Sequence, residues 1–356
     1  LSRQHRRWIV TLYVFGQYVR FIRIDRAGLI VTSAVNYVRD PRTLVEFFWR
    51  YNHLSPPERG FDSTYRIPCY GCRESFAIVD ESKTRPYPNI GYTLSKDYPT
   101  YKVEVVDEDS GDKTWYIIRK PCFDMRSPFG RTTRGFIALR VDNRETIGPS
   151  ALPSMLARKL VFLKDYWRHY TDGVPSEADI YQELAEAGVP HVASYIGGGD
   201  VFTEKHAQHS LTQKVFLVNG LRWVHLSKSL AMHVHHRLVQ QLAFPIGTIR
   251  SAKELIQVLR DAMQALIDAY VKARILHHIS NNNILVASSD SMEETGRGLL
   301  NDWDIARKLQ EELFLRLPRA GTWRFMSVEL LRRSDKPHSI HDDLESMFWV
   351  LAYISI

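Results

Sequence analysis

The chain has 356 residues, of which 44% are hydrophobic and 24% are charged, as in an ordinary globular protein with a large buried core. Its net charge is +7, but 47 lysines and arginines against 40 acidic residues are interspersed charge and not a basic tail. Nucleic acid is therefore not an expected partner. No apolar run is long enough for a membrane span and no signal peptide is visible, so we expect no membrane association and an intracellular protein.

Three cysteines indicate a reducing compartment, because an odd number in a large chain does not fit a disulfide scaffold. Cys69 and Cys72 have the spacing of a metal-ligand pair. A zinc site needs a second pair, and His53 offers one further ligand at most. We therefore expect neither a metal nor a redox role for these cysteines.

The first 120 residues predict β structure with one helix. Two runs of β-branched and aromatic residues are joined by Gly16 and Gln17, which is the signal of a tight hairpin. Residues 53–100 are rich in Pro, Gly and Tyr and predict loops. The expected elements are strands at 7–15, 18–24, 29–32, 101–106 and 113–119, and a helix at 43–52.

The remainder of the chain predicts strands with one helix, and then mainly helices. Ser176 is the expected cap of a helix over 176–188. Ser251 and Glu254 form a capping box at the start of the longest helical pattern, 251–272. The other expected elements are strands at 134–141, 158–164, 211–226, 234–244, 284–287 and 298–301, and helices at 327–333 and 342–354.

This order of elements is that of a two-lobed kinase, in which a lysine contacts phosphate and an acid holds the lysine. Lys164 ends the apolar run 160–164 and is the candidate lysine, although an ordinary edge-strand lysine has the same pattern. Glu177 is its candidate partner, and Glu183 could serve instead. We prefer Glu177 because the residues three and four positions later are apolar and would pack inward. A first-turn acid that only serves the helix dipole is the alternative interpretation.

The most informative stretch is 275–286, which follows the long helix and enters a short strand. Asn283 stands immediately before that strand and is a candidate Mg²⁺ ligand through its side-chain carbonyl. Asn281 and Asn282 fit an ordinary Asn-rich turn. Kinases carry a catalytic aspartate five residues before this asparagine, and here that position is His278.

Three acids further along complete the pattern. Asp302 ends a hydrophobic strand, is followed by Trp303, and is expected to hold Mg²⁺ as the Asp of Asp-Phe-Gly does. The third position of this Asp-Phe-Gly-like motif is Asp304, where most kinases have a conformationally permissive glycine. Glu329 ends a segment similar to a kinase activation segment and is expected to be a structural ion-pair acid. Asp343 stands where kinases have an acid that braces the backbone of the catalytic loop.

The glycine-rich loop is the poorest match to a kinase. The segment 130–135 begins with Gly130, ends with Gly135 and carries Arg131 and Arg134, but it lacks Gly-x-Gly-x-x-Gly. Backbone N–H groups there could still approach the phosphates of ATP. A plain basic turn is an equally good interpretation.

At these residues the chain resembles the fungal-type protein kinase family. The Asp-x-Asp at 302–304 and the Asp-Asp-Leu-Glu-Ser helix start at 342–346 are fairly specific to that family. Asp25–Gly28 and Gly60–Asp62 are similar to the region that precedes its kinase lobes, so the resemblance covers most of the chain. The other matching segments are 162–168, 188–190, 275–277, 279–280, 283–285 and 321–327.

The resemblance implies an α+β, two-lobed protein-kinase-like fold. We expect a β-rich extension over 1–120, a β-rich N-lobe over 121–246 and a mainly helical C-lobe over 247–356. The C-lobe is expected to be partial, because the chain stops at Ile356, early in the helical core. The resemblance also implies ATP and Mg²⁺ as ligands.

The chain departs from the family pattern at His278. The family's Ile-Leu-His-Arg-Asp-Ile-Ser is one residue shorter here, and no carboxylate occupies the catalytic position. Three functions are compatible with this sequence. The first is a Ser/Thr protein kinase homologue that binds Mg-ATP through Lys164, Glu177, Asn283 and Asp302. The second is a pseudokinase or scaffold module, and the third is a small-molecule phosphotransferase, against which the activation-segment pattern argues. Imidazole accepts a proton near neutral pH but lacks the negative charge that orients a hydroxyl, so we expect severely reduced catalysis.

Overall fold

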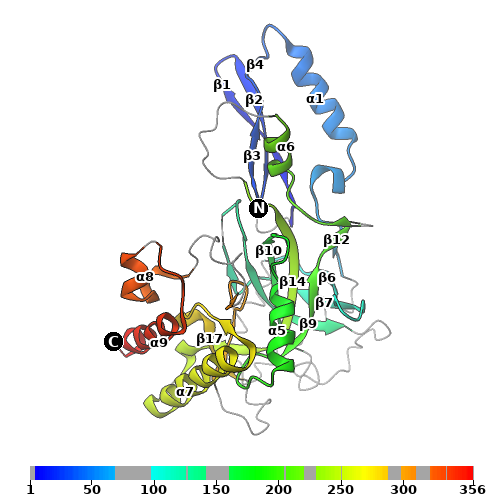
Figure 1. Cartoon of the computed structure of the whole chain (residues 1–356). Coiled ribbons are helices and arrows are strands. Elements are labelled where there is room, and N and C mark those ends of the chain that lie inside the picture. Colours follow the sequence, from blue (N-terminus) through cyan, green and yellow to red (C-terminus); the bar gives the residue numbers. More distant parts are fainter. Residues whose placement is uncertain are drawn as a thin grey trace. The chain divides into compact units, whose positions relative to one another are not determined.

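In a computed structural model, the chain forms two compact units (Figure 1). The first unit contains residues 1–83, 89–174 and 198–237, and the second contains residues 84–88, 175–197 and 238–356. Both combine antiparallel sheets with helices, which agrees with the expected α+β class. The structure describes residues 5–68, 98–125, 127–141, 160–203, 206–219, 230–249, 251–287, 298–309, 321–333 and 335–355.

The first unit begins with a small antiparallel sheet of order β1-β2-β3, in which β4 also pairs with β2. The predicted hairpin at Gly16 and Gln17 is confirmed, because Phe15 and Tyr18 face each other across it. Helix α1 packs on this sheet through the rings of Phe47 and Phe21, whose centroids are 4.5 Å apart. The elements are β1 (Ile9–Phe15), β2 (Tyr18–Asp25), β3 (Gly28–Val31), β4 (Val35–Asn36) and α1 (Pro41–His53), followed by the 3₁₀ turn η1 (Pro57–Arg59).

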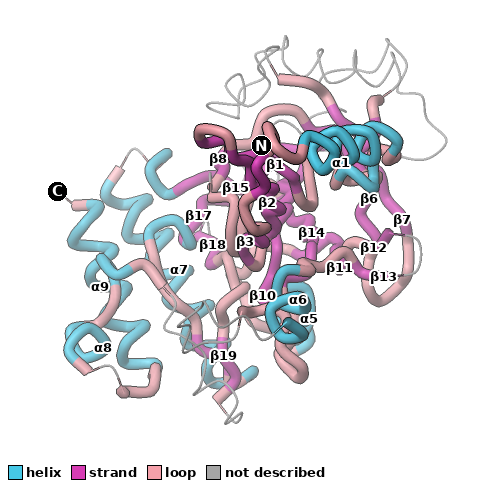
Figure 2. The backbone as a smooth tube through the Cα atoms, turned by 90° about the horizontal axis from the view of Figure 1, so that it is seen from above, coloured by secondary structure: helices cyan, strands magenta, loops and turns pink. Residues whose placement is uncertain are grey.

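The large sheet has the order β11-β14-β10-β9-β7-β6-β5, and β8 pairs with β9. Figure 2 draws its strands in magenta and labels β6, β7, β8, β10, β11 and β14 among them. The predicted boundary at residue 120 falls inside this sheet, because Trp115 of β7 is in register with Val141 of β9. The strands are β5 (Tyr65–Arg66), β6 (Tyr101–Val106), β7 (Lys113–Ile118), β8 (Phe123–Asp124), β9 (Arg134–Val141), β10 (Leu160–His169), β11 (Tyr195–Asp200) and β14 (His233–Gln241).

The core of the first unit lies in strands β6, β7, β9 and β10. Apolar side chains on these strands are almost completely shielded from solvent, which supplies most of the favourable free energy of folding. The most deeply buried are Val103, Ile117, Ile118, Phe136, Ala138, Leu139, Leu163 and Tyr166.

The predicted strand at 211–226 is wrong where the structure describes it, because Thr212–Asn219 forms helix α6. The reason is a tertiary contact at the start of this helix. The Asp25 carboxylate accepts hydrogen bonds from the N–H groups of Leu211 and Thr212, at 2.8 and 3.0 Å, and so satisfies donors that a helix start leaves open. A short hairpin, β12 (Phe202–Thr203) with β13 (His206–Ala207), precedes it.

In the second unit, the predicted helix starts are confirmed. The Ser176 hydroxyl accepts the N–H of Asp179 in a capping box, and the Ser251 hydroxyl accepts the N–H of Glu254. The helices are α5 (Glu177–Glu186), α7 (Ala252–Asp268) with a π turn η3 (Ala269–Ala273), α8 (Val328–Arg332) and α9 (Ile340–Ile354); the 3₁₀ turns are η2 (Ile246–Thr248), η4 (Asn281–Asn283) and η7 (Trp323–Phe325).

Two small sheets complete the second unit. One has the order β15-β17-β18, and the other pairs β16 with β19. Helix α7 presents the predicted apolar face, on which Val258, Leu259, Ala262 and Leu266 are buried. The strands are β15 (Ala243–Pro245), β16 (Ile275–Leu276), β17 (Ile284–Ala287), β18 (Gly298–Leu300) and β19 (Arg307–Lys308). In the described part of the chain, no helix is both long and apolar enough to cross a membrane.

Candidate active site

The hairpin of β17 and β18 brings the two predicted Mg²⁺ ligands to the same end of one small sheet. Ile284 pairs with Leu300, so Asn283 and Asn301 are neighbours just beyond the paired residues. The N–H of Asn301 donates to the carbonyl of Asn283 at 2.8 Å. Asp302 follows Asn301 directly.

The side chain of Asn283 connects both ends of the loop before β17. Its amide Nδ2 donates to the carbonyl oxygen of His278 at 2.9 Å, and its Oδ1 accepts the hydroxyl hydrogen of Ser280 at 2.8 Å. The five-residue spacing in the sequence is thus a direct contact in the structure. It fixes the backbone of His278 relative to the candidate ligand.

Asp302 is held in an unusual backbone conformation by a residue that the sequence analysis did not single out for the site. Its φ is +66°, in the left-handed region that a non-glycine residue rarely occupies. Its N–H donates to the hydroxyl oxygen of Tyr181 at 3.2 Å, and the same hydroxyl donates to Oδ1 of Asn301 at 2.5 Å. The sequence feature that could have indicated this role is the position of Tyr181 on α5, one helical turn after Glu177. Trp303, the next residue, is completely buried.

An amide oxygen and a carboxylate at one end of a hairpin fit Mg²⁺, which prefers oxygen ligands and usually takes one or two from protein. Asn283 and Asp302 are these residues here. Among the described residues, no group of three or more His, Cys, Asp or Glu side chains is arranged to hold a metal ion. Cys69 and Cys72 lie outside the described residues.

Asp343 lies in the first turn of α9 and contacts the catalytic-loop backbone. Its Oδ2 accepts the N–H of His277 at 3.0 Å. The Nε2 of His277 lies 3.0 Å from the carbonyl of Asn301, and its ring meets the Trp303 ring nearly edge-on at 4.4 Å. Burial lowers the pKa of His277, which leaves a neutral ring that donates through Nε2. His277 therefore ties the loop to the segment around Asp302.

His278 faces a different neighbour. Its ring stacks on the ring of His338, with centroids 4.2 Å apart and planes at 14°. The Nε2 of His338 lies 3.1 Å from Oδ1 of Asp343. Burial, together with the nearby His338 and Arg307, lowers the pKa of His278 well below its usual value. The position predicted for a catalytic aspartate therefore carries an uncharged imidazole at neutral pH.

Lys164 lies on β10 and is buried, and its Nζ lies 4.7 Å from the centre of the Tyr166 ring. It belongs to the first unit, whereas Glu177 begins α5 in the second unit. Their predicted pairing stays a prediction. The alternative acid, Glu183, lies 2.6 Å from Nζ of Lys308, and this contact favours Glu177 as the partner.

The two glycines predicted to approach ATP are engaged within the protein. The N–H of Gly130 donates to the carbonyl of Arg26 at 2.9 Å. A Cβ at Gly135 would lie 2.3 Å from the Phe123 ring and 2.8 Å from the Phe162 ring. Gly135 thus makes room for packed aromatic rings, and a phosphate contact at either glycine stays a prediction.

Glu329 lies in the first turn of the short helix α8 and is largely exposed. Its Oε2 is 3.7 Å from Nζ of Lys336. The same ammonium donates to both carboxylate oxygens of Asp342, at 2.5 and 2.6 Å. Within the described residues, Lys336 is therefore the cation nearest to Glu329, and its stronger contact is with Asp342.

A buried cluster of charges surrounds Asp165, the residue after Lys164, and no sequence pattern predicted it. Alternation along β10 points Asp165 to the opposite face, where it accepts hydrogen bonds from Arg134 at 2.8 Å, Arg237 at 3.0 Å and His235 at 3.2 Å. Burial alone would raise the pKa of Asp165, but these three side chains hold it well below its usual value. Nothing in the local sequence signals these contacts, because their partners lie 31 to 72 residues away.

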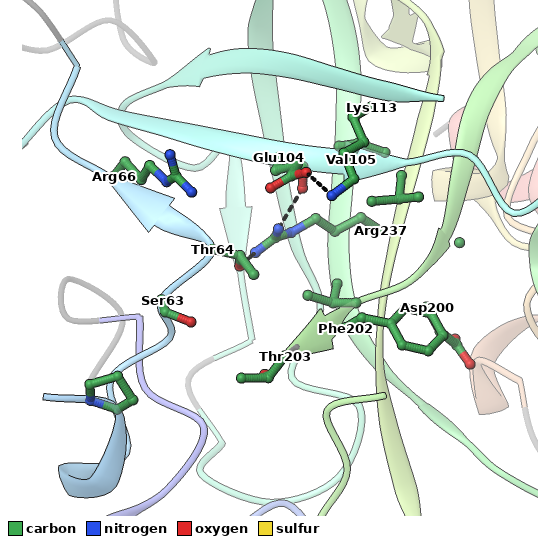
Figure 3. Close-up of a pocket in the computed structure, with 14 residues that line it drawn as sticks. Ser63, Thr64, Arg66, Glu104, Val105, Lys113, Asp200, Phe202, Thr203 and Arg237 are labelled. Carbon is green, nitrogen blue, oxygen red and sulfur yellow. Dashed lines mark hydrogen bonds and ion pairs between the residues drawn. The ribbon is translucent and has the colours of Figure 1, made fainter. Parts of the chain in front are cut away.

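Arg237 of this cluster also lines a cavity of about 390 Å³ in the first unit (Figure 3). Arg237 donates there to the carbonyl of Glu104 at 2.7 Å and to the hydroxyl of Thr64 at 2.9 Å. Lys113 at the rim pairs with the Glu104 carboxylate at 3.2 Å. None of the predicted site residues lines this cavity.

The mixed α and β structure and the geometry of the loop before β17 agree with a kinase-like protein. The family model described as fungal protein kinase matches residues 1–355, essentially the whole chain, and the chain therefore belongs to the fungal protein kinase family. A search of curated proteins finds no match.

Proposed function

We propose that this protein binds Mg-ATP and transfers the γ-phosphate to serine or threonine of a protein slowly at best, so that it acts mainly as a pseudokinase. One observation carries this proposal. The position five residues before Asn283 holds His278, whose partly buried ring stacks on His338 and is uncharged, in place of a carboxylate.

A carboxylate at this position accepts a hydrogen bond from the substrate hydroxyl and directs it at the γ-phosphate. A neutral imidazole can accept the same hydrogen bond, but its lowered pKa makes it a weak base. It also adds no negative charge opposite the metal ions. The carbonyl of His278 stays fixed by Asn283, so the defect concerns the side chain and not the loop.

Nucleotide binding is expected to depend on other residues. Asn283 and Asp302 would hold Mg²⁺, which neutralises charge on the phosphates when bound. Lys164 would contribute a charge-assisted contact to a phosphate. His278 touches the nucleophile in this scheme and not the nucleotide, so its replacement is expected to spare ATP affinity.

The test is to restore a carboxylate with His278→Asp, and separately to replace His278 by Arg-Asp, which restores the family's loop length. Because a positioned general base is worth about 10²–10⁴-fold in rate, phosphate transfer to a generic acceptor protein should rise at least tenfold in one variant. His341→Asp, the same change at an exposed histidine of α9, is the matched control and should change nothing. If the unmodified protein transfers phosphate to the acceptor at a measurable rate that neither repaired variant exceeds, it is an active kinase and the pseudokinase proposal fails.

A further inference from the structure

Among the described residues, helix α1 packs on one face of the small sheet β1-β2-β3, and the side chains of the other face are exposed. Phe47 of α1 packs on Phe21, on the covered face. Tyr13, Phe15 and Tyr18 share the opposite face, because Phe15 and Tyr18 are directly paired and Tyr13 lies two residues before Phe15. These three side chains are 57%, 37% and 43% exposed.

The three exposed rings form a nearly parallel row. The centroids of Tyr13 and Phe15 are 5.3 Å apart with planes at 29°, and those of Phe15 and Tyr18 are 5.8 Å apart with planes at 20°. Leu29 and Val31 of β3, which are 50% and 46% exposed, extend the same face. An apolar surface of this kind on a folded protein marks a binding site.

The charge around this sheet is strongly positive. Residues 1–60 hold ten arginines and no lysine against four acidic residues, a net +6 out of +7 for the chain. Arg7, Arg20 and Arg59 donate to backbone carbonyls, at 2.9, 2.7 and 2.8 Å, and a carbonyl does not neutralise their charge. Arg39 and Arg42 are exposed. The numbers of basic and acidic residues over the whole chain are nearly balanced, which is why nucleic acid was not an expected partner. That total conceals the excess of positive charge in residues 1–60.

We propose that this face of β1-β2-β3 binds single-stranded nucleic acid. Successive bases would stack on Tyr13, Phe15 and Tyr18, and the arginines of the first 60 residues would neutralise phosphates. A duplex keeps its bases stacked inside and cannot use the rings. A second copy of the chain would bring like charges together, which opposes association.

The experiment measures fluorescence anisotropy of 5′-labelled 12-nucleotide oligouridine and oligothymidine, and of a 12-base-pair duplex, with the whole chain. Both single strands should bind more tightly than the duplex. Their affinity should fall about tenfold or more between 50 and 200 mM salt, because bound arginines release counterions. No binding to either single strand at 50 mM salt, or equal affinity for the duplex, would overturn the proposal.

The variant that tests stacking is Tyr13→Leu with Tyr18→Leu, which keeps an apolar surface but removes two ring faces. Affinity for single strands should fall about 5- to 150-fold for each lost stack. Phe48→Leu at an exposed position of α1 is the matched control and should bind like the wild type. An unchanged affinity in the double variant would show that the rings do not stack on bases.

Two further measurements keep the test decisive. Should the double variant fail to fold, as judged by its thermal unfolding, Arg39→Gln at an exposed site should still weaken binding and reduce its salt dependence. Sedimentation velocity examines self-association. A dimer that the leucine double variant abolishes would assign the face to a second copy and reject the nucleic-acid proposal.

Discussion

Gly60 shows how a single residue position is fixed by backbone contacts. Its φ is +90°, and an added Cβ would lie 2.1 Å from the carbonyl oxygen of Trp8. The neighbouring Arg7 donates its N–H to the carbonyl of Gly60 at 2.8 Å. A side chain at this position would therefore separate the segment before β1 from the turn after η1.

Gly60→Ala should lower the free energy of unfolding by about 2–4 kcal/mol, because a left-handed backbone penalty adds to a clash with main-chain atoms. Urea denaturation of both proteins measures the difference. Gly173→Ala is the matched control: its φ is +79°, but no atom lies within 4 Å of the added Cβ, so it should cost only about 1–2 kcal/mol. Equal losses in the two variants would mean that the Trp8 contact is unimportant.

At the scale of elements, β14 concentrates titratable groups. It carries His233, His235 and His236, all of them buried. The Nδ1 of His236 lies 2.9 Å from the Asp200 carboxylate, and His235 contacts Asp165. His233 instead faces the ring of His169 at 4.3 Å. Burial in this strand and the nearby His169 lower the pKa of His233 to about 4.

A lowered histidine pKa gives a definite sign of pH dependence. Between pH 6.5 and about 4 the unfolded chain binds a proton at His233 that the folded chain excludes, so acid favours unfolding in this window. Above pH 6.5, His233 is neutral in both the folded and the unfolded chain and does not lower the free energy of unfolding. Below pH 6.5, its protonation in the unfolded chain lowers the free energy of unfolding by about 1.4 kcal/mol per pH unit.

His233→Gln should therefore unfold with a shallower acid dependence between pH 6.5 and 4 than the wild type. Thermal denaturation at half-unit pH intervals measures the slope. His5 and His278, whose pKa values burial lowers, also contribute to the acid dependence of the wild-type stability. Both proteins share these contributions, so the difference in slope between His233→Gln and wild type isolates His233. His206→Gln at an exposed position is the control and should keep the wild-type slope. Parallel curves for His233→Gln and wild type would contradict the assignment.

At the scale of the whole molecule, membership of the fungal protein kinase family covers both units. The prediction that follows concerns the predicted phosphate-binding lysine. Lys164→Met should weaken Mg²⁺-dependent ATP binding about tenfold or more, because it removes a charge-assisted contact to phosphate. Titration with a fluorescent ATP analogue, with and without Mg²⁺, measures this.

Lys253→Met at an exposed position of α7 loses the same charge and serves as the control for that titration. It should bind ATP like the wild type, since a change in net charge alone has little effect at a distance in physiological salt. If Lys164→Met and Lys253→Met bind equally well, Lys164 is not a phosphate contact. ATP binding that persists without Mg²⁺ would count against Asn283 and Asp302 as metal ligands.

Local patterns in the sequence predicted much of the secondary structure. The hairpin at Gly16 and Gln17 depends on turn chemistry, and the starts of α5 and α7 depend on Ser176 and Ser251. These signals act over a few residues, so one sequence contains them completely. The spacing between His278 and Asn283 is also local, and the hydrogen bond between them follows from it.

The tertiary structure decided what depends on residues distant in sequence. Helix α6 forms where a strand was predicted because Asp25, 186 residues before Leu211, accepts its N–H. Asp165 collects partners from β9 and β14, and Tyr181 supports Asp302 from 121 residues away. The uncharged state of His278 likewise depends first on burial and then on His338, which only folding brings against it. The sequence by itself determined which chemical groups are present, whereas burial and distant partners determined their charge and orientation, because both arise only when separate segments pack together.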